Sequence, residues 1–494
     1  MSGHRVGLFV IATAIVAARC GTSPAGPDLP PAGEPASLKP ASHLDCDSAD
    51  DIRARIDALE ADGTLNAGRA TALRTKLDQA ERYESTGRTA EAGQAYARLI
   101  AQVAGWIDEG SLPEEDVEEL LGCAEDVADG PDASFTAITA GGLHSCGLIE
   151  TGAAYCWGFN SAGQLGDGNA GIDGDTPVPV QSGNVFVSLS TGGFHTCGLI
   201  TGGSAFCWGG NAVGQLGHGD AGTNSDMPVP VLGDHSFLSI SAGVLHSCGV
   251  TYTGAALCWG SNAFGQLGDG NLGTNSDTPV PVADGHTFAT ISAGDQHTCG
   301  VTVAGIALCW GSNAAGALGD GNEGVGSDTP VAVSDGHVFA SISAGSQFSC
   351  GLTSGGIGFC WGRNFEGQLG DGNAPTISDI PVAVSGGHVF ATIDAGSLHT
   401  CGVTTAAEAL CWGLNSDGQL GDGNAPTRRE TPGLVEGGSG FETISGGGLL
   451  GSGHHTCGIN AAGEGFCWGD NRFGQLGDGN EGADSDTPVP ILSP

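Results

Sequence analysis

Residues 288–333 read FATISAGDQHTCGVTVAGIALCWGSNAAGALGDGNEGVGSDTPVAV, and close copies of this stretch fill the C-terminal part of the chain. A spacing of 51 residues separates the phenylalanines that open the copies: Phe135, Phe186, Phe237, Phe288, Phe339, Phe390 and Phe441. A fixed period near this length is the sequence signature of a repeat architecture. One copy is too small to bury both faces of a sheet, so neighbouring copies must stack and the array must close.

Each copy contains four short segments that are typical of β-strands. In the fourth copy the first three are Ala289–Gly294 (ATISAG), His297–Val301 (HTCGV) and Ala307–Gly311 (ALCWG). The last segment carries two prolines in several copies, as in Thr278–Val282 (TPVPV), and proline cannot donate a hydrogen bond within a central strand. We therefore expect this strand at the outer edge of each sheet, where proline also discourages aggregation. A glycine-rich turn such as Asn160–Asn169 precedes it.

Two motifs within the copies resemble the repeat of the regulator-of-chromosome-condensation family. They are Trp157–Asn160 (WGFN) followed by Gly163–Gly168 (GQLGDG), and Ala140–His144 (AGGLH) ahead of the second strand. The chain departs from this pattern where Ala317 replaces glutamine, Phe348 replaces histidine and His218 replaces aspartate. The resemblance implies an all-β seven-bladed propeller over residues 133–494. Propellers host many unrelated functions, so the fold alone leaves the function open.

The N-terminus has the features of a targeting segment. Arg5 precedes an apolar run, Val6–Ala18, whose length fits a signal peptide and falls short of a membrane span. Cys20 closes this run and a Pro/Gly-rich linker follows over residues 21–46, which resembles a bacterial lipoprotein cleavage site, although Arg19 departs from that pattern. We expect residues 1–20 to be a signal peptide, with Cys20 as a candidate lipidation site; an ordinary cleaved signal is the alternative. Either reading predicts export, to the outer membrane or cell surface as a lipoprotein, or to the extracellular space.

Residues 47–130 are expected to form a small all-α module of four helices ahead of the propeller. Apolar residues recur at helical spacing, and Ser111–Glu114 (SLPE) is a capping box that would open the last helix. The segment resembles the FIMAH-type helical domain of secreted bacterial proteins, through Lys76–Ala80 (KLDQA), the turn at Gly87, Ala95, and the face formed by Leu99, Ile100, Gln102 and Val103. The role of that family is poorly defined, so the resemblance adds location rather than chemistry.

The 17 cysteines form a nearly closed set of pairs. Fourteen lie ten residues apart on the second and third strands, where they can face one another across a hairpin and form disulfides: Cys146/Cys156, Cys197/Cys207, Cys248/Cys258, Cys299/Cys309, Cys350/Cys360, Cys401/Cys411 and Cys457/Cys467. Cys46 and Cys123 flank the helical module and could pair with each other. Cys20 is then left over, as a lipidated cysteine would be. This arithmetic favours an oxidising compartment.

Two metal sites are alternatives to weigh. His195, Cys197 and Cys207 offer three zinc-type ligands, but Phe348 breaks the equivalent set in the fifth copy. Alternating oxygen-bearing residues suited to calcium occur at Asp167, Asn169, Asp173 and Asp175, and related clusters occur at Asp269/Asn271/Asp277, Asp320/Asn322/Asp328 and Asp478/Asn480/Asp484/Asp486. Glycine and asparagine are also ordinary turn formers, so we predict no cofactor and keep calcium as a candidate.

The charge distribution narrows the choice of partner. From Ala133 onward the chain has 31 Asp and Glu against four Arg and no Lys. Such a field repels phosphate backbones and anionic lipid, so we expect no nucleic-acid partner and membrane contact only through the possible lipid anchor. No nucleophile-elbow, zinc-protease or phosphate-loop motif occurs, and we expect no enzyme.

The repeated side chains are expected to serve structure. Strand alternation places each tryptophan opposite to its cysteine, which predicts packing between blades. The repeated histidines, such as His195 and His246, are expected to form hydrogen bonds within turns. Features found in one copy only are better candidates for recognition: five extra residues within Gly446–His454, the pair Arg428–Arg429, Arg363 and Arg472.

These observations predict an exported envelope protein that presents a disulfide-stapled propeller to a protein or glycan ligand through one face. Two alternatives remain open. The repeat is similar to that of a secreted β-lactamase-inhibitory protein that binds its target through one propeller face, so the chain could be an inhibitor of an extracellular enzyme. It could also be an enzyme that acts on cell-surface polysaccharide.

Overall fold

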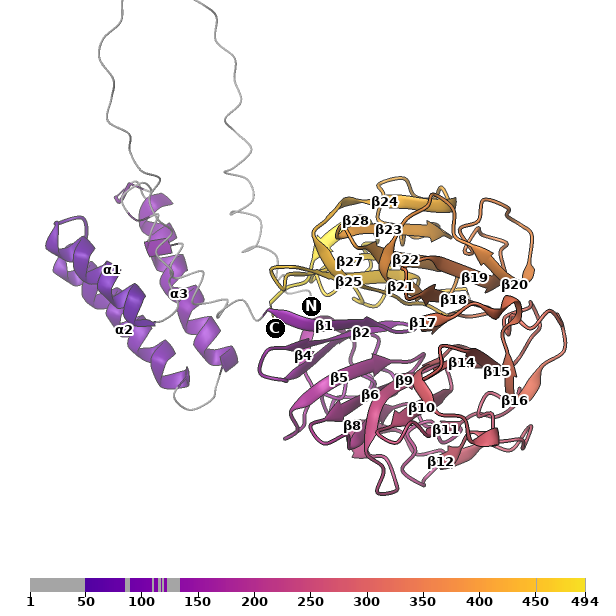
Figure 1. Ribbon diagram of the computed structural model, residues 1–494. Coiled ribbons are helices and arrows are strands. Elements are labelled where there is room, and N and C mark those ends of the chain that lie inside the picture. Colours follow the sequence, from indigo (N-terminus) through magenta and orange to yellow (C-terminus); the bar gives the residue numbers. More distant parts are fainter. Residues whose placement is uncertain are drawn as a thin grey trace, which may run out of the picture. The chain divides into compact units, whose positions relative to one another are not determined.

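The computed structural model describes residues 49–84, 89–108, 111–113, 117, 120–121, 134–449 and 451–493. The N-terminal part of the described chain is helical, with α1 at Ala49–Ala61, α2 at Ala67–Glu84 and α3 at Thr89–Asp108 (Figure 1). Their buried residues include Ile52, Ile56, Leu73, Leu77, Leu99 and Val103. None of the described helices is both long enough and apolar enough to cross a membrane.

Ion pairs join α1 to α2 on their exposed side. Arg53 lies 3.0 Å from Asp78 and 2.7 Å from Glu81, and Arg74 pairs with Asp57 and Glu60. Of the predicted fourth helix, only a turn falls within the described residues, where the Leu121 N–H donates to the Val117 carbonyl at 2.9 Å. The remainder of that helix, Cys20, Cys46 and Cys123 lie outside the described residues.

Residues 134–493 form seven four-stranded antiparallel sheets. The first strands are β1 Phe135–Ala140, β5 Phe186–Thr191, β9 Phe237–Ala242, β13 Phe288–Ala293, β17 Phe339–Ala344, β21 Phe390–Ala395 and β25 Phe441–Gly446. The second strands are β2 His144–Ile149, β6 His195–Ile200, β10 His246–Thr251, β14 His297–Thr302, β18 Phe348–Thr353, β22 His399–Thr404 and β26 His455–Asn460.

The outer half of each sheet repeats in the same way. The third strands are β3 Ala154–Gly158, β7 Ala205–Gly209, β11 Ala256–Gly260, β15 Ala307–Gly311, β19 Gly358–Gly362, β23 Glu408–Gly413 and β27 Gly465–Gly469. The fourth strands are β4 Gly174–Pro179, β8 Ser225–Pro230, β12 Ser276–Pro281, β16 Ser327–Ala332, β20 Ser378–Ala383, β24 Arg429–Ser439 and β28 Ser485–Pro490. In Figure 1 the fourth strands lie at the periphery, so the proline-rich segments are outer edges as predicted. The two short 3₁₀ turns are Ala283–Gly285 and Ser334–Gly336.

Every sheet takes its four strands consecutively, so the sheets are seven complete blades and the predicted seven-bladed all-β propeller is confirmed. We number the blades 1 (β1–β4) to 7 (β25–β28). The ring closes where blade 1 meets blade 7, and no strand is shared across this junction. The Phe135 N–H donates to the Gly463 carbonyl at 2.8 Å, just as the Phe186 N–H donates to Gly152 at 2.9 Å between blades 1 and 2. Closure therefore uses the same backbone contact as five of the other six interfaces, while at blades 6 and 7 the Gly440 N–H donates to the Ala407 carbonyl at 2.7 Å.

The core lies between blades. Phe288 and Trp310 of blade 4 pack against Cys248, Val250 and Leu267 of blade 3, and the other interfaces repeat this arrangement. The Trp310 indole N–H donates to the Gln266 carbonyl at 2.9 Å, so the large ring is buried without an unpaired donor. The predicted packing of tryptophan between blades is confirmed.

A glycine in each second strand makes room for the phenylalanine that opens the blade. A Cβ placed on Gly300 would lie 2.7 Å from Cδ1 of Phe288, closer than real carbon contacts allow. The repeat keeps glycine in this strand for that reason, although glycine weakens strand interiors through its backbone entropy.

Disulfide bonds staple the middle hairpin of every blade. Cys248 and Cys258 lie directly opposite in the β10–β11 register, with Cα atoms 4.1 Å apart. The other six bonds join Cys146–Cys156, Cys197–Cys207, Cys299–Cys309, Cys350–Cys360, Cys401–Cys411 and Cys457–Cys467. All fourteen cysteines are buried.

Replacing Cys248 and Cys258 together by alanine is expected to lower the free energy of unfolding by about 3 kcal/mol, because the unfolded chain regains the entropy of an 11-residue loop. Urea titration of the oxidised full chain measures this change. Thiol titration of the denatured, unreduced wild type is the control and should show no free thiols from these two cysteines. An unchanged midpoint in the double variant would contradict the expectation.

Candidate binding face around the central cavity

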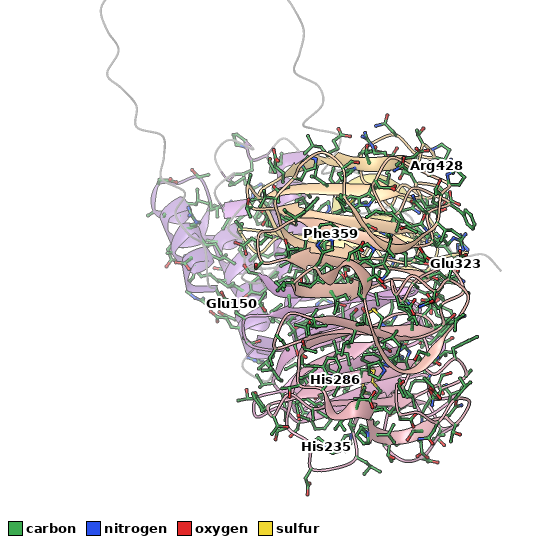
Figure 2. The ribbon with its side chains drawn as sticks, turned by 45° about the vertical axis from the view of Figure 1, so that its right-hand side comes forward. Glu150, His235, His286, Glu323, Phe359 and Arg428 are labelled. Atoms are coloured by element: carbon green, nitrogen blue, oxygen red, sulfur yellow. A yellow bond between two sulfur atoms is a disulfide. The ribbon has the colours of Figure 1, made fainter. Side chains whose placement is uncertain are left out.

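The two flat faces of the propeller carry different loops. One face, which we name the cavity face, carries the loops between first and second strands and the long loops between third and fourth strands. The opposite turn face carries the turns between second and third strands and the connections between blades. In Figure 2, Glu323 and Arg428 from the long loops lie on one side of the propeller, and Glu150 from a turn lies on the other.

A belt of hydroxyl groups joins the first strands at the centre. The Ser190 hydroxyl accepts the Ala242 N–H at 3.0 Å, and Ser241 accepts the Ala293 N–H at 3.0 Å. The same bond continues around the ring through Ser292, Ser343, Ser445 and Thr139, each to the strand of the next blade. In blade 6 a carboxylate replaces the hydroxyl, and Oδ2 of Asp394 accepts the Gly446 N–H at 2.9 Å.

The repeated histidines, which open the second strands, form a second belt of bonds between blades. His195 Nε2 lies 2.8 Å from the Ser247 hydroxyl of the next blade. That hydroxyl donates its own hydrogen to the Gln215 carbonyl at 2.9 Å, so the histidine must donate from Nε2. Burial lowers the pKa of His195 to about 3, so the ring is neutral at pH 7. Equivalent pairs are His144–Thr196, His246–Thr298, His297–Ser349, His399–Thr456 and His455–Ser145.

The prediction that these histidines bond within turns is wrong for Nε2, which reaches the next blade in all six cases. Sequence spacing could not show this, because the partner lies a whole repeat away. In blade 5, Phe348 occupies the histidine position and is fully buried, while Thr400 of blade 6 keeps its bond to the Gln368 carbonyl at 2.8 Å. The fold thus tolerates a phenylalanine at one position of the belt.

In four loops between third and fourth strands, side chains considered for calcium close the loop, and Asp371 and Asp422 do the same in blades 5 and 6. Oδ1 of Asp167 accepts the Asn160 amide at 3.0 Å and the Asn169 N–H at 3.2 Å, and Asp173 accepts the Asn160 N–H at 2.7 Å. Asp269, Asp320 and Asp478 repeat the first of these bonds, while Asp175 lies in β4. In the part of the chain that the structure describes, no group of three or more His, Cys, Asp or Glu side chains is placed to hold a metal ion.

The zinc alternative is wrong. Cys197 and Cys207 are joined in a disulfide, and the His195 ring is turned to Ser247 of the neighbouring blade. The three groups therefore serve two different structural bonds.

Departures from the repeat gather on the cavity face in two sectors. Blades 7, 1, 2 and 3 present an apolar sector, formed by Phe473, Leu143, Phe159, Phe194, Leu245 and Phe264. The matching positions of blades 4 to 7 are more polar, and we name as the polar sector Gln296, Gln347, Arg363, Glu366, Asp417 and the buried Asp470. Blade 6 keeps Leu398 and Leu414 at two of these positions, and blade 4 keeps Ala315 at one. The rings of Phe159 and Phe473 are 4.7 Å apart, so the apolar sector continues across the junction of blades 1 and 7.

The unique residues found in the sequence all belong to this face. The Arg363 guanidinium lies 5.2 Å from the centre of the Phe365 ring and donates to Gln347 at 3.2 Å. Arg428 donates to the Phe365 carbonyl at 2.9 Å, and Arg429 pairs with Asp422. These arginines are partly neutralised by neighbours but keep exposed surface.

The insertion of blade 7 folds over the rim of the cavity. Its backbone turns back between Leu449 and Ser452. A Cβ on Gly142 of blade 1 would lie 2.9 Å from Leu449 Cδ2, so the insertion packs on the first blade. Buried Asp470 holds its end, accepting the Gly453 N–H at 3.1 Å and pairing with Arg472 at 3.2 Å.

The centre of the cavity face is a partly open cavity of about 150 Å³. Its wall consists of the last residues of the seven first strands and of the small residues that follow them. Close approach requires glycine here, since a Cβ on Gly243 would lie 2.3 Å from the Gly294 carbonyl oxygen. Two acidic side chains interrupt this wall of small residues, Asp295 in blade 4 and Asp394 in blade 6.

Comparison with known proteins agrees with this architecture. The RCC1-like domain matches residues 101–384 and 204–494, and the FIMAH domain matches residues 49–129. The chain belongs to the RCC1-like family. Among relatives of this RCC1-like chain, the ultraviolet-B receptor UVR8 of Arabidopsis thaliana is 31% identical over 318 residues, which cover 62% of this chain and 70% of UVR8. The E3 ubiquitin-protein ligase HERC2 of Mus musculus is 31% identical over 325 residues, 63% of this chain but 6% of HERC2, so the chain spans only a small part of that protein.

Solved structures of low identity show the RCC1-like fold alone. Human WBSCR16 has a TM-score of 0.62 at 20% identity and covers 69% of this chain and 95% of its own. Yeast RCC1 (Prp20), solved bound to Kap60, has a TM-score of 0.60 at 19% identity and covers 73% of this chain and 85% of its own.

Sequence reasoning missed Asp295 and Asp394. Each is a substitution at one position of one copy, and neither belongs to a motif. Superposing the seven copies reveals them, because Asp394 stands where other blades have serine or threonine and Asp295 where Ser346 and Ser397 stand.

Substituting His246 by phenylalanine, as blade 5 does naturally, is expected to flatten the acid dependence of stability. Burial lowers the pKa of His246 from 6.5 to about 3, so between these values the unfolded chain binds a proton that the folded chain does not. The contribution of His246 to the free energy of unfolding is complete above pH 6.5. It decreases as the pH falls, by up to about 1.4 kcal/mol per pH unit. Urea midpoints at pH 7, 6, 5 and 4 measure the slope.

Thr298→Val is the control, because it removes the bond to His246, together with the Thr298 bond to the Gln266 carbonyl, and keeps the buried histidine. Its slope should stay close to that of the wild type. Burial raises the pKa of Asp295 and of Asp394, so these two groups make the folded chain more stable as the pH falls, which is opposite to the effect of the histidines. Because this effect is the same in all three proteins, the difference between their slopes reports on His246. Equal slopes for His246→Phe and wild type would contradict the expectation.

Proposed function

We propose that this chain is an exported, non-catalytic envelope protein whose disulfide-stapled propeller binds a partner protein through the cavity face. The observation that carries the proposal is the apolar sector beside the polar sector on that face. Residues that build the blades recur in nearly every copy, so they can be explained by the fold. The apolar and polar sectors cannot be explained in this way, because blade packing does not require them.

The chemistry of the face fits a protein ligand better than a glycan. An apolar sector beside a polar sector with arginines resembles the anchors and rim of protein–protein interfaces. Phe264 is 45% exposed and lies in this apolar sector, where its ring is accessible to a partner. Yeast RCC1 (Prp20) was solved bound to Kap60, and its binding to Gsp1p and histones has been examined, which supports a protein-binding role for a related propeller.

Export rests on the N-terminal apolar run and on the cysteines. Seven buried disulfides, one in each blade, form and persist in an oxidising compartment and are rare in the cytosol. Attachment to the outer membrane or cell surface through Cys20 is part of the proposal, with release to the outside as its alternative. The acidic propeller would remain in solution and away from anionic lipid.

Two aromatic residues of blade 3 test the choice of face. Phe264 lies in the long loop after β11 on the cavity face, and Tyr252 lies in the turn after β10 on the opposite face and is 62% exposed. The immobilised full chain is exposed to envelope and culture-fluid proteins of the native source, and retained proteins are identified by mass spectrometry. Wild type and Tyr252→Ser should retain the same protein, and Phe264→Ser should retain at least tenfold less of it.

Circular dichroism and urea midpoints establish that both variants fold like the wild type. Loss of retention in Tyr252→Ser with none in Phe264→Ser would move the interface to the turn face and overturn the proposal. Retention of a polysaccharide in place of a protein would overturn the choice of ligand class.

A further inference from the structure

The central cavity has the chemistry of a cation site. None of its lining residues is Lys, Arg or His, and the lining carries two carboxylates, of Asp295 and Asp394, among glycine, alanine, serine, threonine and one valine, Val244. Its volume of about 150 Å³ suffices for a group about the size of benzene, but the polar wall does not suit an apolar group. A small ligand there must therefore bring positive charge and hydrogen-bond donors.

Neither carboxylate has a cationic partner among the described residues. Oδ2 of Asp295 accepts the Ser346 hydroxyl at 2.5 Å, and Asp394 accepts the Ser343 hydroxyl at 2.8 Å and the Gly446 N–H at 2.9 Å. Burial raises the pKa of Asp295 to about 6 and raises that of Asp394 as well, because these hydrogen bonds replace only part of the lost hydration. A cation beside them would restore the charged forms.

Ser397 supplies an observation independent of the acids. It lines the cavity, is 4% exposed, and its hydroxyl has no hydrogen-bond partner in the described structure. Buried hydroxyls are normally paired, so the Ser397 hydroxyl is an unsatisfied polar group in the cavity wall. It lies in blade 6, three residues after Asp394.

The backbone around Ser397 is also incomplete. Elsewhere in the ring a backbone N–H binds the glycine carbonyl of the next blade, as Val244 does to Gly294 at 3.2 Å and Gly193 to Gly243 at 3.1 Å. The equivalent bonds to the carbonyls of Gly396 and Gly447 are missing from the described residues. The side of the cavity near Asp394 thus keeps carbonyl oxygens free to accept.

We propose that the central cavity binds a primary ammonium group through Asp295, Asp394, the Ser397 hydroxyl and the neighbouring glycine carbonyls. An ammonium has three donors that can point to separate acceptors, whereas the described residues form no compact ligand set for a metal ion. The group can come from a free amine or from a lysine of a bound protein; the second source rests on the proposed function.

The repeat itself supplies substitutions that remove the charge and keep the wall. Asp394→Ser restores the serine found at this position in five other blades, so the bond to Gly446 is retained. Asp295→Ser installs the residue that Ser346 and Ser397 provide in blades 5 and 6. Asp284→Asn is the matched control, since Asp284 is an exposed acid of the turn face at a positive φ of 64° that asparagine also adopts.

Calorimetric titration of the full chain at pH 7.5 and about 0.15 M salt, where distant surface charges are screened, tests the proposal. The probes are n-butylamine, the peptide acetyl-Gly-Gly-Lys-Gly-Gly-amide, and the same peptide with its lysine acetylated. Wild type and Asp284→Asn should bind butylamine or the lysine peptide at one site and ignore the acetylated peptide. Each single serine variant should weaken binding at least tenfold, and the double variant should abolish it.

Binding of butylamine alone assigns a free amine, and binding of the peptide as well assigns a lysine end as a ligand. The proposal is overturned if wild type binds neither probe, or if the double variant binds as well as wild type while its urea midpoint shows that it is folded. The result is separable from the choice of face, because Phe264→Ser leaves the cavity wall intact and should still bind butylamine.

Discussion

Seven sheets of one size can each bury a face only if the first also packs against the last, and in this chain that last junction has no shared strand to hold it. Hydrogen bonds of side chains must therefore hold blade 7 to blade 1, because no connecting segment of chain joins these two blades. The hydroxyl belt, the histidine belt and the indole bonds to glutamine carbonyls supply them, and all three run unchanged through the junction of blades 7 and 1, as Ser445–Ala140, His455–Ser145 and Trp157–Gln475 show.

The same requirement explains the composition. Close approach at the centre and beneath the phenylalanines demands glycine, and glycine raises the entropy that folding must overcome. A disulfide across the middle hairpin of every blade reduces that entropy in the unfolded chain and offsets part of the cost. Neutral, buried histidines complete six of the seven seams, with the consequence that acid favours the unfolded chain.

Strict repetition also separates structure from recognition. A residue type that recurs in every blade is explained by the packing that closes the ring. A residue found in one blade only is not explained by that packing. On the cavity face, departures from the repeat form the rim sectors, the insertion of blade 7 and the two carboxylates of the cavity wall. Asp394 belongs to both groups, because its carboxylate keeps the hydroxyl belt intact and also adds a charge to the cavity.

The repeat, the number of blades, the order of the strands, the outer position of the proline-rich strand and the ten-residue cysteine pairs can all be predicted from the sequence. These features follow from local periodicity, because strand alternation and hairpin length act within one copy. The tertiary structure was needed to show that His195 bonds to Ser247, that the acidic loop residues close their own turns, and that Asp295, Asp394 and Ser397 line one cavity. The histidine contact and the cavity join residues from different copies, so their geometry exists only once the ring has closed. The loop bonds are local, but the same oxygen-bearing residues also fit a calcium site, so the sequence left the choice open.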